Sequence, residues 1–101
     1  MKIEVLYFDD CPNYGPTLEL VRQVVSDLNV DAEITSVEIK GADDAQRLRF
    51  LGSPSVHIDG RDADPDARGR MQYNFGCRRY GQSGCPPRLM LEQVIQAGVR
   101  S

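Results

Sequence analysis

Three cysteines are the residues of this 101-residue chain best suited to covalent chemistry. Cys11 follows an apolar run and precedes a proline-containing turn, whereas Cys77 and Cys85 both lie in the C-terminal third. An odd number of cysteines without a Cys-x-x-Cys pair indicates neither a disulfide framework nor a tetrahedral zinc site. The pattern indicates free thiols that react with disulfides or peroxides, or thiolates that bind a soft metal ion.

Cys11 is expected at the junction of a strand and a helix. Apolar patterning predicts a strand over residues 2–8 and a helix from about Pro12 or Pro16 to Leu28. Unpaired N–H groups at a helix N-terminus favour an anion, and cysteines there titrate anywhere from about 3.5 to about 7.5. We therefore expect Cys11 to be a reactive thiolate. The two preceding aspartates would raise its pKa and keep it protonated only if one of them is buried beside the sulfur. The alternative is a small residue that fills the strand end.

The remaining elements follow from periodicity and turn residues. They are a strand over 32–39, a helix over 41–51, a strand over 56–58, a polar loop over 61–69, a strand over 71–78 and a last helix after Pro87. A strand, a helix and a second strand in succession form a parallel unit with a right-handed crossover. The order βαβα-ββα predicts one α/β domain over residues 1–101, with a mixed four-stranded sheet and helices on both faces.

Cys77 belongs to the expected strand over residues 71–78. Apolar and polar residues alternate there, which places Cys77 on one face with Met71, Tyr73 and Phe75. This arrangement predicts a buried, inert cysteine. The alternatives are a bridge to Cys85 or a role as a third reactive thiol.

Composition and charge exclude several classes of protein. Hydrophobic residues make up 41% and charged residues 27%, which is typical of a globular domain. The net charge of −3 gives no general signal for nucleic acid, and no apolar run reaches the roughly 18 residues of a membrane helix. The N-terminus lacks the features of a signal peptide, so a cytoplasmic location is expected. Residues 61–101 are rich in arginine, which either steers an anionic partner or forms a solvated surface.

Three motifs carry a resemblance to a known superfamily. Cys-Pro-Asn-Tyr at residues 11–14 lies where thioredoxins and glutaredoxins have Cys-x-x-Cys. Ser-Pro-Ser at 53–55 is similar to their cis-proline loop, and Gly-Cys-Pro at 84–86 is similar to the glutathione-binding turn of glutaredoxins. More narrowly, Tyr-Phe-Asp-Asp-Cys-Pro, Arg-Phe-Leu-Gly-Ser-Pro-Ser and Cys-Arg-Arg-Tyr resemble a bacterial group of small thioredoxin-like proteins, the DF family of (seleno)proteins. Some members are labelled alkylmercury-lyase-like, and the resemblance covers nearly the whole chain.

The resemblance implies a thioredoxin-like domain with a redox site around Cys11. It implies a cis peptide before Pro54, with Ser53, Pro54 and Pro12 binding an extended substrate through the neighbouring backbone. Tyr14 stands where a second active-site cysteine would be, so Cys11 has no local partner. The Tyr14 hydroxyl is expected either to donate to the Cys11 sulfur or to pack against the proline loop.

Two chemical functions and one binding function remain open. In the first, Cys11 attacks a disulfide, a sulfenic acid or a peroxide and is resolved by Cys85, by Cys77 or by an external thiol, without a cofactor. The partner is then a protein or a low-molecular-weight thiol or disulfide. In the second, Cys11, Cys77 and Cys85 bind a soft ion such as mercury, copper(I) or arsenite. The third is a catalytically silent binding module.

Three further polar residues have open roles. His57 is the only histidine of the chain and either serves as a base for a nearby thiol or belongs to the sheet surface. Arg78 and Arg79 attract an anionic substrate, help the Cys11 thiolate or keep a strand edge soluble.

Overall fold

The strands form one mixed sheet in the computed structural model, which describes residues 1–100. The strands are β1 (Lys2–Tyr7), β2 (Glu33–Glu38), β3 (Ser55–Ile58) and β4 (Arg61–Asp62), and the helices are α1 (Tyr14–Asp27), α2 (Ala42–Arg47) and α3 (Arg88–Arg100), with a 3-10 helix η1 at Pro65–Ala67. The strand order is β2-β1-β3-β4. β1 is parallel to β2 and antiparallel to β3, which is antiparallel to β4. The predicted α/β class and mixed four-stranded sheet are confirmed.

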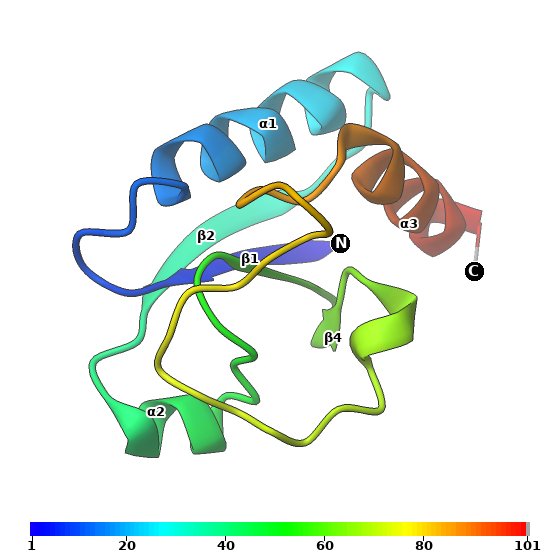
Figure 1. Cartoon of the computed structure of the whole chain (residues 1–101). Helices are drawn as coiled ribbons and strands as arrows, with labels where there is room; N and C mark the ends of the chain where they lie inside the picture. The colour runs from blue at the N-terminus through cyan, green and yellow to red at the C-terminus, as the bar shows by residue number, and fades with distance from the viewer. Residues whose placement is uncertain (101) are drawn as a thin grey trace.

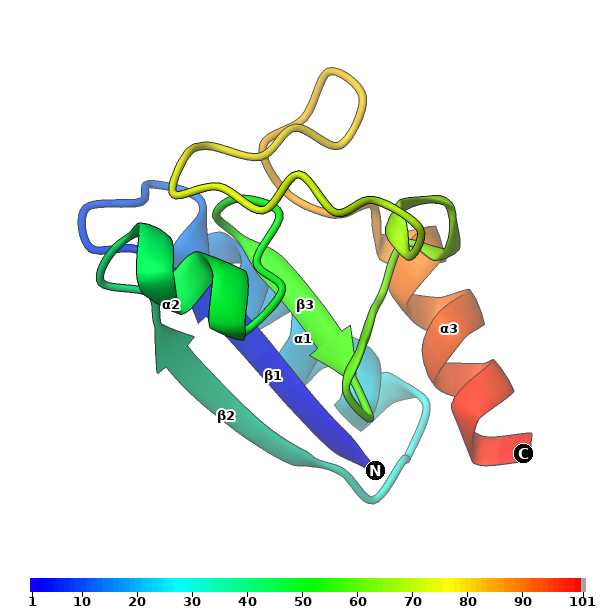
Figure 2. The ribbon, with the colours of Figure 1, turned by 90° about the horizontal axis from the view of Figure 1, so that it is seen from below.

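Helices cover both faces of the sheet, as predicted. Figure 1 shows α1 and α3 on one face and α2 on the other, and Figure 2 shows α2 in front of the sheet when it is seen from below. Each face therefore has its own apolar cluster. Ile3 and Val5 of the central strand pack under α1 and α3, whereas Leu6 packs with Phe50 on the α2 side. Because β1 is covered on both faces, its sequence is a nearly continuous apolar run.

The second helix is shorter than predicted because the chain ends it with a left-handed residue. Arg49 has a φ of 56°, and the Phe50 N–H donates back to the Ala45 carbonyl at 2.8 Å. This is the hydrogen bond of a Schellman C-cap, which usually has glycine at the left-handed position. The cap stops the helix before Leu51 and turns Phe50 into the core.

The fourth strand was predicted in the wrong place. Residues 71–78 form no strand and pair only through an isolated bridge from Cys77 to Ser53, and β4 instead lies within the segment 61–69, which was predicted as a loop. The predicted burial also fails, because Met71 and Phe75 are exposed while Arg78 is buried. The apolar alternation is misleading here because residues 71–77 stay at the surface, where Tyr73 is only half-buried, and the one buried side chain of the segment is the polar Arg78.

No helix within residues 1–100 is both long and apolar enough to cross a membrane.

Candidate active site

Cys11 lies in the turn that joins β1 to α1. Its backbone N–H donates to the Phe8 carbonyl at 3.3 Å, and its own carbonyl accepts from Tyr14, the first residue of α1, at 3.3 Å. The thiol is half-buried and unpaired. Asp10 takes a left-handed φ of 67°, which aspartate tolerates better than most residues. The turn thus holds a free thiol just ahead of the helix N-terminus, with Pro12 exposed beside it.

The loop before β3 lies beside this turn. The Ser53–Pro54 peptide is cis, as the resemblance implied. The Ser53 hydroxyl accepts a hydrogen bond from the Phe8 N–H at 3.3 Å. Because β3 runs antiparallel to β1, with Ser55 opposite Leu6, the loop reaches the end of the sheet where the Cys11 turn begins. The two segments are therefore joined by a direct hydrogen bond.

Cys85, in the turn that precedes α3, lies close to the same region. Its sulfur lies 3.8 Å from both the backbone oxygen and the Oδ1 of Asn13, two residues after Cys11. Gly84 makes this approach possible, because a Cβ there would lie 2.7 Å from the Asn13 Cγ. The free, half-buried Cys85 thiol consequently faces the start of α1.

Tyr14 does not take either of its predicted positions. Its ring stacks on Tyr7 with centroids 3.8 Å apart, and its hydroxyl donates to the Ser36 Oγ at 2.8 Å. The hydroxyl therefore points toward β2, and the predicted hydrogen bond to Cys11 is not formed. Tyr14 positions the first turn of α1 and does not touch the candidate thiol through its hydroxyl.

Residues 76–78 form hydrogen bonds with the backbone groups of Ser53 in the proline loop. The Ser53 N–H donates to the Gly76 carbonyl at 2.8 Å, and the Ser53 carbonyl accepts from the Arg78 N–H at 2.9 Å. The resemblance implies that these backbone groups of Ser53 pair with an extended substrate. Cys77, between these two contacts, is exposed and free, so the prediction of a buried cysteine is wrong. An extended partner could pair with Ser53 only after this segment moves away.

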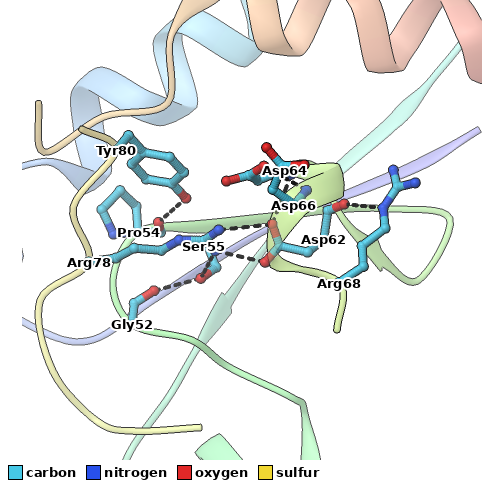
Figure 3. Close-up of polar contacts among 9 residues, drawn as sticks. All are labelled: Gly52, Pro54, Ser55, Asp62, Asp64, Asp66, Arg68, Arg78 and Tyr80. Atoms are coloured by element: carbon cyan, nitrogen blue, oxygen red, sulfur yellow. Dashed lines mark hydrogen bonds and ion pairs between the residues drawn. The ribbon is translucent and has the colours of Figure 1, made fainter. Parts of the chain in front are cut away.

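A buried ion pair fixes residues 76–78 against the proline loop (Figure 3). Both Arg78 terminal nitrogens donate to the Asp62 carboxylate, at 2.7 and 3.0 Å, and one also donates to the Ser55 Oγ at 3.0 Å. The Ser55 hydroxyl in turn donates to the Gly52 carbonyl at 2.6 Å. Gly52 is required here, because its φ is 115° and a Cβ would lie 3.0 Å from that of Arg78.

Tyr80 adds a second tie to the proline loop. Its hydroxyl donates to the Pro54 carbonyl at 2.6 Å, and the Arg78 guanidinium lies 4.6 Å from its ring centroid. Burial raises the pKa of Tyr80, so the hydroxyl keeps the proton that it donates. Sequence reasoning missed both this contact and the ion pair. Apolar alternation pointed to the opposite parity, and nothing near Asp62 marks it as the partner of a distant arginine.

The structure does not gather the three cysteines into a metal centre. Within residues 1–100 no group of three histidine, cysteine or acidic side chains is placed to hold a metal ion. Cys77 pairs with Ser53 of the proline loop, whereas the Cys85 sulfur contacts Asn13. The predicted three-thiolate site therefore has no support in this arrangement.

No protein-family model, curated protein or solved structure matches this chain. The functional argument accordingly rests on its own residues.

Proposed function

We propose that this protein is a thiol–disulfide redox protein with a thioredoxin-like domain, in which Cys11 is the nucleophile and Cys85 the resolving thiol. The observation that supports the proposal is the approach of the Cys85 turn to the Cys11 turn. The Cys85 sulfur lies 3.8 Å from Asn13, two residues from Cys11. The cis-proline loop, hydrogen-bonded to Phe8, forms the adjacent wall.

The reaction needs two exchange steps. The Cys11 thiolate attacks one sulfur of a small disulfide, the disulfide bond breaks, and the departing thiolate takes a proton from water. The Cys85 thiolate then attacks the Cys11 sulfur and releases the second thiol. The substrate gains two electrons and two protons, and Cys11 and Cys85 become a disulfide. A low-molecular-weight thiol in excess reduces that disulfide and restores the protein.

The contacts of Ser53 favour a small substrate over a protein chain. Both of its backbone groups are already bonded to residues 76–78. A low-molecular-weight disulfide needs no such pairing, whereas an extended chain would have to displace a segment that the buried Arg78–Asp62 pair holds. We therefore place the substrate among the low-molecular-weight disulfides.

Trapping the intermediate tests this proposal. In a protein with Cys77→Ser and Cys85→Ser, Cys11 is the only thiol, and bis(2-hydroxyethyl) disulfide should leave one stable mercaptoethanol adduct. With Cys77→Ser alone, Cys85 should resolve that adduct, so the protein loses two hydrogens and retains no adduct. Intact-protein mass spectrometry distinguishes the products. A persistent adduct on Cys11 in the Cys77→Ser protein would contradict the role of Cys85, and an unreactive Cys11 would contradict the proposal itself.

A further inference from the structure

A pocket of about 400 Å³ lies away from the cysteines, between the end of α2, strands β3 and β4 and the segment that follows η1. In Figure 1 this segment crosses below the sheet from η1 toward α2. Four arginines line the pocket from separate parts of the chain. They are Arg49, Arg61, Arg68 and Arg70.

The positive charge of this pocket is not neutralised by its lining. Within residues 1–100, Arg49, Arg61 and Arg70 form no ion pair with an acid. Arg68 donates to the Asp62 backbone oxygen at 2.9 Å. Asp62 is the one acid among the described lining residues, and its carboxylate is held by the buried Arg78. Four arginines therefore line a concave surface whose only carboxylate is already paired.

A buried histidine lines the same pocket. His57 is 7% exposed, yet its imidazole has no hydrogen-bond partner within residues 1–100. Neither ring nitrogen is completely buried, so both keep some access to solvent. Burial lowers the pKa of His57, opposed by the carboxylates of Asp62 and Glu4 on the flanking strands and assisted by Arg78. The neutral ring has one donor and one acceptor. An otherwise buried imidazole whose unpartnered nitrogens keep access to a pocket is suited to a ligand.

We propose that this pocket binds a small organic phosphate ester, with the phosphate on the arginines and the His57 imidazole and the organic part against Tyr73 and Leu51. Guanidinium groups match phosphate oxygens in geometry as well as in charge. The volume is in the usual range for small-ligand sites. The site shares no residue with the cysteine turns and does not depend on the proposed redox function.

A larger groove along α3 differs from this pocket in the charge of its lining. It has a volume of about 810 Å³, and its lining includes Asp59, Asp64 and Asp66 together with Arg61 and Arg68. The aspartate carboxylates oppose an anion there, and no buried histidine lines that groove. Arg61 and Arg68 lie between the two hollows and line both, whereas Arg49, Arg70 and the unpartnered imidazole of His57 line the smaller pocket and not this groove.

The single histidine makes binding directly observable. Its imidazole proton signals in the NMR spectrum come from one residue, because the chain has only His57. Titration with phenyl phosphate should shift these signals saturably, with half-saturation below about 10 mM. Inorganic phosphate should bind more weakly, since it lacks the aromatic group, and phenol should not shift them. The absence of a saturable shift, or an equal shift with phenol, would overturn the proposal.

Two arginine variants separate binding from folding. Arg49→Gly removes a charge where the φ of 56° suits glycine better than arginine, so the melting temperature should not fall. Phenyl phosphate affinity should fall at least about fivefold, as it should with Arg61→Gln. Arg22→Gln, on α1 across the sheet, makes the same charge change as Arg61→Gln and should leave the affinity within about twofold. If Arg22→Gln weakens binding as much as the pocket variants, only general electrostatic attraction is present and the site is refuted.

Discussion

Substitution of Cys11 by serine is expected to lower the turnover of small disulfides by on the order of 10³-fold or more. The first exchange step requires a sulfur nucleophile, and a serine hydroxyl cannot form the mixed disulfide. The measurement is the rate of bis(2-hydroxyethyl) disulfide reduction with excess glutathione as reductant, after subtraction of the uncatalysed exchange. Both side chains are small and Cys11 is only half-buried, so the variant should fold.

The other cysteines provide matched controls for this measurement. Cys77→Ser should keep the rate within about twofold, because Cys77 is exposed and has no role in either proposed step. Cys85→Ser should lower the rate less than Cys11→Ser, since glutathione can resolve the mixed disulfide in its place. Unchanged turnover in Cys11→Ser, or a larger loss in Cys77→Ser, would assign the chemistry to a different thiol.

Substitution of Asp62 by alanine is expected to cost about 3–5 kcal/mol of unfolding free energy. The Arg78 and Asp62 side chains are only 5% and 7% exposed, so removal of the carboxylate leaves a buried guanidinium without its counter-ion. A loss of this size is a large part of the roughly 5–15 kcal/mol that stabilises a typical domain. Chemical denaturation monitored by circular dichroism gives the value.

A double substitution tests whether the ion pair is the cause of this loss. Asp62→Ala with Arg78→Met removes both charges and should recover much of the stability, because the unpaired charge accounts for most of the cost. Recovery will be incomplete, since Arg78 also donates to Ser55 and contacts the Tyr80 ring. A cost below about 1 kcal/mol for Asp62→Ala would mean that Arg78 finds water or another acceptor, and that the proline loop does not depend on this pair.

The sequence predicts most of the fold because its strongest signals are local. The apolar run of β1 and the helical stripe of α1 are recognisable without tertiary information, and both ends of α1 lie within two residues of the bounds expected from Pro12 to Leu28. The segment 71–78 shows where this reasoning stops. Arg78 is buried through contacts with Gly52 and Asp62, which are distant in sequence, while the apolar Met71 and Phe75 stay exposed.

The candidate site is predictable in part for the same reason. Cys11 was placed by its position between a strand and a helix, and Cys85 by resemblance to a turn before the last helix. The Tyr14–Ser36 hydrogen bond and the pairing of Ser53 with residues 76–78 involve segments far apart in the chain, and no local pattern indicates either. The unpartnered imidazole of His57 became visible only when its neighbours were known.

The central claim is that Cys11 and Cys85 form a redox pair across the junction of two turns. The most direct measurement is disulfide mapping of the wild-type protein after equilibration with oxidised and reduced glutathione, followed by alkylation and peptide mass spectrometry. The account predicts a Cys11–Cys85 disulfide as the main intramolecular product, with Cys77 alkylated or glutathionylated. A dominant Cys77–Cys85 disulfide, or Cys11 left reduced while Cys85 is oxidised, would contradict it.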